Sequence, residues 1–364
     1  MPAQRQPSAP PSSRAIAWWL VVCAAMIFIM VVIGGATRLT ESGLSMVEWK
    51  PLTMVPPLSE AQWQDEFAAY RSSPEYRLKN AGMSLAAFKK IYWFEFTHRL
   101  WGRLIGFVFA VPLLYFIWRR AVDRPLLFKL AGLFILGGLQ GALGWFMVAS
   151  GLVDRPDVSQ YRLAAHLTLA FAVYGLIVWL ALELFEQGRE RPPSTLAPAL
   201  QRAARFLPFF ALVVVGAGAF VAGINAGLIY NTFPLMDGRV IPEGLYSMRP
   251  WYMSAFEDAT TVQFNHRVLA LSLFALIAVV WARAGRVVTG RTRAVLNAMM
   301  IMALVQAGLG ISTLVLQVPL GLALAHQAGA LALFTFTVWF AHTQRAASPA
   351  PAGAHPPFHA EPAE

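Results

Sequence analysis

The sequence predicts an all-α polytopic membrane protein whose eight transmembrane helices form two pseudo-two-fold-related four-helix bundles. Three observations lead to this fold class. The 364 residues are 57% hydrophobic and only 13% charged, with a mean hydropathy of +0.54, whereas soluble proteins carry roughly 25% charged residues. The apolar residues gather in long uncharged stretches, and these stretches repeat in two halves of the chain. An ordinary soluble enzyme is therefore excluded.

A helix that crosses a bilayer core takes about 20 apolar residues, and this length sets the scale for the predicted spans. The final apolar stretch, 294–344, is too long for one span, and residues 317–321 around Pro319 offer a natural break. The first span is too long for a removed signal peptide and lacks a cleavage site. The predicted spans lie at 15–36, 98–118, 130–153, 163–182, 206–227 and 266–281, with two more inside 294–344.

The distribution of Lys and Arg predicts the orientation. If the N-terminus is inside, both tails and the short loops near 119–129, 183–205 and 283–293 carry most of the excess of basic over acidic residues. The positive-inside rule then places both termini in the cytoplasm. The net charge of +10 reflects this topology, and nucleic acid is not expected as a partner.

The predicted spans also divide the chain into domains. Two Pro-rich tails are expected to be disordered, and a cytoplasmic linker joins two four-helix halves. The boundaries are 1–14 for the first tail, 15–185 for the N-terminal half with its outer loop 37–97, 186–205 for the linker, 206–342 for the C-terminal half and 343–364 for the last tail.

The long outer loop contains two further helix signals. Ser59 and Gln62 form a capping box ahead of Trp63, Phe67 and Tyr70, which share one helical face. A second helix is expected to start after Ser84 and to run into the second span. These helices either lie on the membrane surface or also cover a site below them.

Three segments of the first half recur in the second half in the same order. They are Phe96-Thr97-His98-Arg99 with Phe264-Asn265-His266-Arg267, Leu139–Gly144 with Val305–Gly310, and Leu163–Leu167 with Leu322–Gln327. Because both copies enter the membrane from the same side, they are parallel repeats, as in one class of transporters. The glycine pairs Gly137/Gly141 and Gly223/Gly227 are interpreted as helix-packing contacts.

Four of the seven histidines fall inside the repeat, at equal depth and two in each half: His98, His166, His266 and His326. Ionisable residues inside a membrane are costly and usually functional. Two imidazoles on different helices of one bundle suit the two axial positions of a heme iron. The only cysteine, Cys23, lies mid-span, which excludes a Cys-based metal site. A proton relay, a transporter site and a structural role remain alternatives.

Arg99 and Arg267 each follow one of these histidines. A guanidinium near a helix start suits a carboxylate, and heme propionates are carboxylates. The alternative is an arginine whose head group reaches the aqueous interface.

One residue breaks the repeat. Glu95 lies one helical turn before His98, whereas its counterpart is Gln263. A carboxylate beside a heme edge can take a proton or stabilise positive charge, and an amide does neither well. The first half is therefore expected to do chemistry and the second to carry electrons. The alternative for Glu95 is a solvated interfacial carboxylate.

Over roughly residues 15–342 the sequence resembles the heme A synthase family. The resemblance rests on the eight spans, the repeat, the four histidines, the Glu95-x-x-His98-Arg99 motif and the stretch Gly34–Ser45. Some members carry a cysteine pair in the first outer loop. This chain has no cysteine there, so it resembles the subgroup without the pair, and no disulfide relay is assumed.

The resemblance implies a membrane oxidoreductase that acts on a CH3 group and turns heme O into heme A, needed for cytochrome c oxidase biogenesis. His98 and His166, with Arg99, would hold the substrate heme, and His266 and His326, with Arg267, would hold heme b. Glu95 would be catalytic, assisting oxidation of a ring methyl to an alcohol and then to a formyl group. It also implies the bacterial inner membrane, with heme sites toward the periplasm.

Two other functions are compatible with the same residues: an electron-transfer cytochrome b, such as a quinone-linked membrane anchor, and a heme-free transporter built from repeats. The sequence leaves open the electron acceptor and the source of the inserted oxygen. It also leaves open a homo-oligomer, and docking of a heme O synthase or an oxidase assembly factor.

Overall fold

The computed structural model describes residues 11–48, 55–151, 158–189 and 193–345. Within these ranges the chain is helical and contains no strand. Most of the two expected tails, 1–10 and 346–364, lies outside the described residues, but the first helix already begins at Pro11, inside the expected N-terminal tail. The long helices are α1 (Pro11–Leu39), α4 (Leu85–Trp118), α5 (Arg124–Gly151), α6 (Gln160–Phe185), α7 (Pro198–Gly223), α9 (Ala259–Ala284), α10 (Gly290–Val315) and α11 (Leu320–Thr343). The short ones are α2 (Glu60–Arg71), α3 (Pro74–Leu78), α8 (Ser254–Glu257) and two 3-10 turns, Ala226–Leu228 and Trp251–Met253.

All eight long helices are long and apolar enough to cross a membrane, so the eight predicted spans are confirmed. The predicted break in the last apolar stretch is also confirmed. Gln317 and Val318 adopt positive φ angles of 62° and 59°, and Pro319 precedes α11. A β-branched residue rarely adopts such a φ, and proline restricts the residue before it. These residues therefore turn the chain sharply between α10 and α11.

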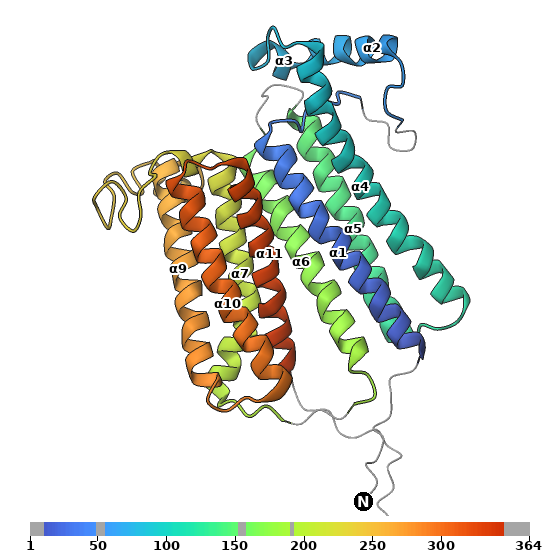
Figure 1. Cartoon of the computed structure of the whole chain (residues 1–364), viewed down its shortest axis with the longest axis vertical. Coiled ribbons are helices and arrows are strands. Elements are labelled where there is room, and N and C mark those ends of the chain that lie inside the picture. Colours follow the sequence, from blue (N-terminus) through green and yellow to red (C-terminus); the bar gives the residue numbers. More distant parts are fainter. Residues whose placement is uncertain (1–10, 49–54, 152–157, 190–192, 346–364) are drawn as a thin grey trace, which may run out of the picture.

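The long helices pack as two quartets that lie side by side (Figure 1). In the N-terminal half, α1 and α5 each contact both α4 and α6. In the C-terminal half, α7 and α10 each contact both α9 and α11. The seam between the halves is formed by α1 and α6 against α7 and α11. In both halves the four helices follow one another around the quartet in the order of the chain, as a repeat requires. The pseudo-two-fold axis between the halves stays a prediction.

The N-terminal half carries a helical cap beyond the bundle, formed by residues 59–80 with α2 and α3, whereas the described outer loop of the C-terminal half contains two 3-10 turns and the four-residue α8 (Figure 1). The predicted capping box is present: the Ser59 hydroxyl accepts from Gln62 N, and Gln62 Oε1 accepts from Ser59 N. The cap packs on the first turns of α4 through a buried, mainly aromatic cluster made of Met46, Trp63, Phe67, Tyr70, Phe88, Tyr92 and Phe96. It is therefore fastened to α4 and covers its first turns, which favours the second of the two interpretations of this loop.

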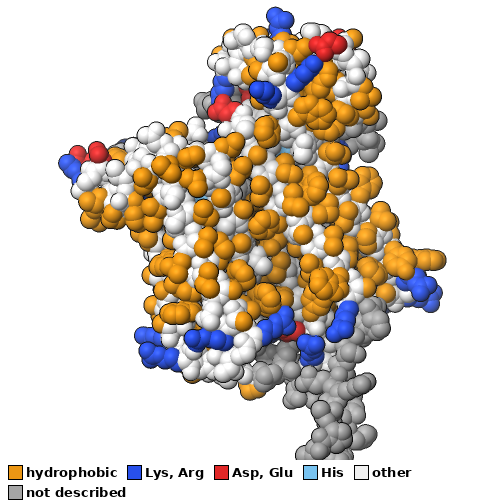
Figure 2. Space-filling view, in the orientation of Figure 1, with side chains coloured by type: hydrophobic (Ala, Val, Ile, Leu, Met, Phe, Trp, Pro, Cys, Tyr) orange, Lys and Arg blue, Asp and Glu red, His pale blue; other side chains and the backbone are white. Residues whose placement is uncertain are grey.

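On the face shown in Figure 2, hydrophobic side chains cover the helices, and Lys and Arg gather at the end opposite to the cap. Exposed arginines at that end include Arg119, Arg120, Arg283 and Arg286. This distribution is typical of a multi-pass membrane protein. Cys23 is fully buried in the apolar core, as expected of a packing residue.

Candidate functional site

The four repeated histidines lie on four helices that begin at the cap end of the molecule. His98 is on α4, His166 on α6, His266 on α9 and His326 on α11. The helices of each predicted pair stand opposite each other in their quartet, because the other two helices contact both. The structure thus places the two histidines of each predicted pair on opposite helices of one quartet, while the pairing itself stays a prediction.

Each imidazole packs against a glycine of a neighbouring helix. A Cβ atom added at Gly34 would stand 3.2 Å from His98 Nε2, and one at Gly144 would stand 3.1 Å from His166 Cε1. The corresponding distances in the C-terminal half are 3.0 Å from Gly218 to His266 Cε1 and 2.8 Å from Gly310 to His326 Cε1. All four imidazole rings therefore need the space that glycine leaves.

A glutamine contacts the second imidazole of each half. The Gln140 amide nitrogen lies 3.2 Å from His166 Nδ1 and 3.1 Å from His166 Nε2, and it donates to the His166 carbonyl at 3.1 Å. The Gln306 amide nitrogen lies 3.1 Å from His326 Nδ1 and donates to the His326 carbonyl at 2.9 Å. A second partner on a metal-binding histidine fixes its ring orientation. Both glutamines lie in the repeated segments 139–144 and 305–310. The repeat could therefore have indicated them as site residues, but only the histidines, the arginines and Glu95 are predicted as such from the sequence.

Two arginines hold matching loops in the two halves. Arg99 donates to the carbonyls of Met46 at 2.9 Å and Glu48 at 3.3 Å. Arg267 donates to the carbonyls of Tyr230 at 2.7 Å and Thr232 at 2.9 Å. The acceptors are equivalent, because Met46 and Tyr230, like Glu48 and Thr232, are 184 positions apart.

The same spacing of 184 positions relates Gly34 to Gly218, and Glu41 to Asn225. Glu41 and Asn225 each have a positive φ just after the first helix of their half, 51° and 55°. The duplication thus extends from the helices into the loops that the arginines hold. The expected propionate contact remains a proposal, and Arg267 Nε is buried without a hydrogen-bond partner among the described residues.

Glu95 is 2% exposed and makes three polar contacts. Oε2 accepts from Ser45 Oγ and from Met46 N, both at 2.7 Å, and Oε1 accepts from Arg99 at 2.5 Å. A freely solvated carboxylate is therefore excluded for Glu95. Its counterpart Gln263 instead donates to the Tyr230 carbonyl at 3.1 Å, and Gln263 Oε1 has no partner within the described ranges.

The interpretation of Gly137 and Gly141 as a helix-packing contact is wrong. A Cβ added at Gly137 or Gly141 would meet no described atom within 4 Å, so these glycines do not pack against a neighbouring helix of the chain. The four-residue spacing indicates that both glycines lie on one face of a helix, but it does not indicate whether another helix packs on that face. Gly223 does pack closely, because a Cβ added there would stand 2.6 Å from the Gln160 Cβ.

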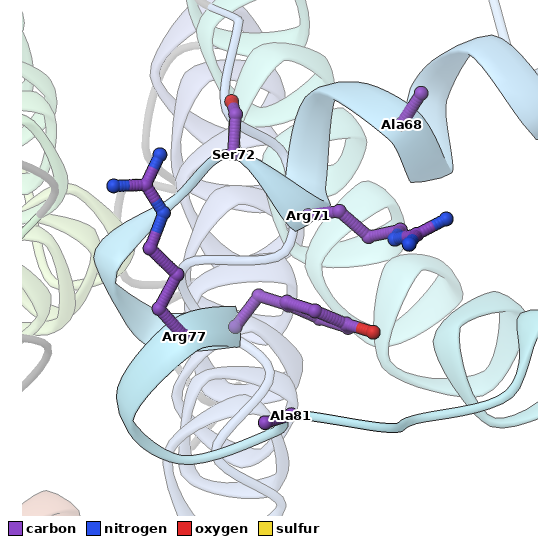
Figure 3. Close-up of a pocket in the computed structure, with 6 residues that line it drawn as sticks. Ala68, Arg71, Ser72, Arg77 and Ala81 are labelled. Atoms are coloured by element: carbon purple, nitrogen blue, oxygen red, sulfur yellow. The ribbon is translucent and has the colours of Figure 1, made fainter.

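Two surface hollows lie apart from the imidazoles. An open pocket of about 590 Å³ on the cap is lined by Ala68, Arg71, Ser72, Tyr76, Arg77 and Ala81 (Figure 3). A mainly apolar groove of about 340 Å³ runs between α1 and α4 and is lined by Val32, Ile33, Ala36, Lys90, Trp93, Phe94 and Thr97. Neither contains a predicted site residue.

The cap also holds a buried polar cluster. The Tyr70 hydroxyl donates to Glu75 Oε2 at 3.1 Å, and the Asn80 amide donates to the Tyr70 oxygen at 2.7 Å. Glu75 is 3% exposed. Burial raises the pKa of Glu75 from its ordinary 4.5 to about 7.

The residues present fit a heme iron in each half. Imidazole nitrogen is a standard axial ligand, and each half offers two imidazoles on opposite helices with glycines beside them. No group of three or more His, Cys, Asp or Glu side chains gathers as a metal site in the described part of the chain. The donor set is therefore a pair of imidazoles in each half.

Comparison with known proteins identifies the family. The model of the family described as "Cytochrome oxidase assembly protein" (COX15-CtaA) matches residues 17–338. The heme A synthase of Nitrosospira multiformis is 52% identical over 334 residues, covering 91% of this chain and 94% of the relative. The chain belongs to the heme A synthase family.

Two further heme A synthases show the same relation. Those of Parvibaculum lavamentivorans and Paramagnetospirillum magneticum are 50% and 48% identical, and each alignment covers 90% of this chain and more than nine-tenths of the relative. The resemblance drawn from the sequence motifs is thus confirmed at the level of the whole chain.

Proposed function

We propose that the chain is the enzyme that its relatives' name states, a heme A synthase. Its substrate is heme O, whose ring methyl is oxidised to an alcohol and then to the formyl group of heme A. One observation carries this proposal. The two halves offer equivalent imidazole pairs, but only the first has a buried carboxylate, Glu95, one turn before its first histidine. Relatives near 50% identity over most of the chain support the proposal.

In this proposal the N-terminal half is the substrate site. His98 and His166 hold the substrate heme, and the glycines facing them give the two imidazole rings their space. Arg99 keeps the 45–48 loop against α4, and a propionate of the substrate is its proposed further contact. Glu95 is the catalytic residue: it accepts a proton as the methyl and then the alcohol are oxidised. The Arg99 ion pair and the Ser45 hydroxyl hold its carboxylate in position.

The C-terminal half is proposed as the cofactor site. His266 and His326 would ligate heme b, and Arg267 Nε is free for a propionate. Bound there, heme b supplies one-electron redox chemistry. Gln263 in place of Glu95 leaves this half without a proton acceptor beside the heme.

The site is proposed to face the periplasm of a bacterial inner membrane, with both termini in the cytoplasm. The basic residues gathered at the end opposite to the cap support this orientation (Figure 2). A lateral approach from the lipid suits a substrate with a farnesyl tail. A heme O synthase and an oxidase assembly factor remain candidate partners.

The direct test is co-expression of the chain with a source of heme O, followed by extraction and chromatography of the porphyrins bound to the purified protein. The proposal predicts heme b together with hydroxylated and formylated products of heme O. Heme b alone, with no conversion, would support an electron-transfer cytochrome b instead. A preparation without a Soret band would exclude both heme functions and leave the transporter.

A further inference from the structure

One polar contact joins the two halves next to a proposed ligand of each. Gln327 directly follows His326 on α11 and reaches across the seam to α1, where its amide donates to the Val31 carbonyl at 2.9 Å. Val31 lies one turn before Gly34, the glycine that faces His98. This contact therefore connects the helix of one imidazole to the wall of the other imidazole site.

The partner position on α1 has to be glycine. A Cβ atom added at Gly35 would stand 2.3 Å from Gln327 Oε1 and 3.1 Å from Leu324 Cδ2. Non-bonded atoms do not approach this closely, so any side chain at residue 35 would push the amide off the Val31 carbonyl. The two residues form one joint: Gly35 provides the space and Gln327 the hydrogen bond.

The equivalent place on the other side of the seam has no such joint. The repeat places Leu167, directly after His166, where Gln327 stands, and it places Ala219 where Gly35 stands. Leucine offers no hydrogen bond. The polar joint thus belongs to one of two equivalent places, the one that links the proposed cofactor ligand His326 to the proposed substrate site.

We propose that Gln327 and Gly35 are positioning residues that fix the His326 imidazole relative to the substrate site and so set electron transfer between the two halves. The inference rests on the proposed function. A single hydrogen bond can do this because it fixes the rotation of α11 about its axis at the residue next to His326. Rotation of the helix would turn the imidazole plane and change the gap that electrons cross.

The test compares Gln327→Leu, which introduces the residue of the equivalent position, with Gly35→Ala, which displaces the amide without changing it. The matched control is Tyr174→Phe. This change removes another hydrogen bond across the same seam, from Tyr174 to Thr335 at 2.8 Å, two turns or more from the imidazoles. The purified holoprotein is measured in two ways: by the electron paramagnetic resonance g-values of oxidised heme b, which report the angle between its axial imidazoles, and by the rate of heme O conversion.

Both test variants should keep heme b, shift its g-values and slow conversion. Tyr174→Phe should match the wild type in both measurements. Unchanged g-values and rates in both test variants would overturn the inference. Loss of heme b from both would overturn it as well, because Gln327 would then be a packing residue. Absence of heme O conversion in the wild type would contradict the proposed function, while the g-values would still decide the positioning role.

Discussion

The two halves of the molecule share a frame around their histidines and differ in the group that stands one turn before the first histidine. Both place two imidazoles against glycines, both set a glutamine on the second histidine, and both use an arginine to hold the loop after their first helix. At the position one turn before the first histidine, one half has a buried carboxylate and the other an amide. In the proposed function, the shared frame would bind the hemes and the exchanged residue would provide the chemistry.

The largest expected effect comes from making the first half resemble the second. Glu95→Gln should lower heme O conversion by about 10²–10⁴-fold, the usual contribution of a general acid or base. Heme b should stay bound, because its site lies in the other half. The measurement is the ratio of formylated product to extracted heme O.

Ser45→Ala provides the matched control for this change. It removes one hydrogen bond to Glu95 and leaves the carboxylate, so conversion should fall far less than in Glu95→Gln. Wild-type conversion by the Glu95→Gln variant would contradict the catalytic role of Glu95.

The next effect tests the shared frame through its glycines. Gly310→Ala would place a Cβ 2.8 Å from the His326 ring, whereas a Cβ at Gly308 on the same helix meets no described atom within 4 Å. Forcing the ring aside should weaken heme b binding by about 1–3 kcal/mol, the usual cost of overpacking. Titration of the apoprotein with heme b checks this. Equal affinities in Gly310→Ala and Gly308→Ala would show that the ring does not need this glycine.

The helices and the placement of the histidines on them could be predicted from the sequence because they follow from local patterns. Uncharged stretches define the spans, the Ser59 capping box defines the start of α2, and a repeated motif places matching side chains at matching depth. The other parts of the site depend on contacts between distant segments. No local pattern indicates that Gly34 faces His98, that Arg99 holds the Met46 carbonyl, or that no helix covers Gly137. Those contacts appear only when the quartets are assembled.

The smallest effect concerns the cap of the N-terminal half. Buried Glu75 has its pKa raised to about 7, so the folded cap holds a proton that the unfolded cap releases at lower pH. Cap stability should therefore be highest below about pH 4.5 and fall as the pH rises to about 7, where it levels off. Glu75→Gln should remove this slope. Hydrogen exchange of residues 59–80, corrected for the intrinsic pH dependence of exchange, measures it.

The exposed carboxylate of Asp65 on α2 provides the control for the cap. Asp65→Asn should keep the wild-type slope. A slope that persists in Glu75→Gln would mean that another group of the cap binds the proton.

The central claim is that each half holds one heme between its own two imidazoles. The most direct measurement is the heme content of four purified single variants, His98→Ala, His166→Ala, His266→Ala and His326→Ala, produced with a source of heme O. The account predicts that the first two lose heme O and its products but keep heme b, and that the last two lose heme b. Full b-type absorbance in His266→Ala or His326→Ala, or loss of heme b in His98→Ala and His166→Ala, would contradict it.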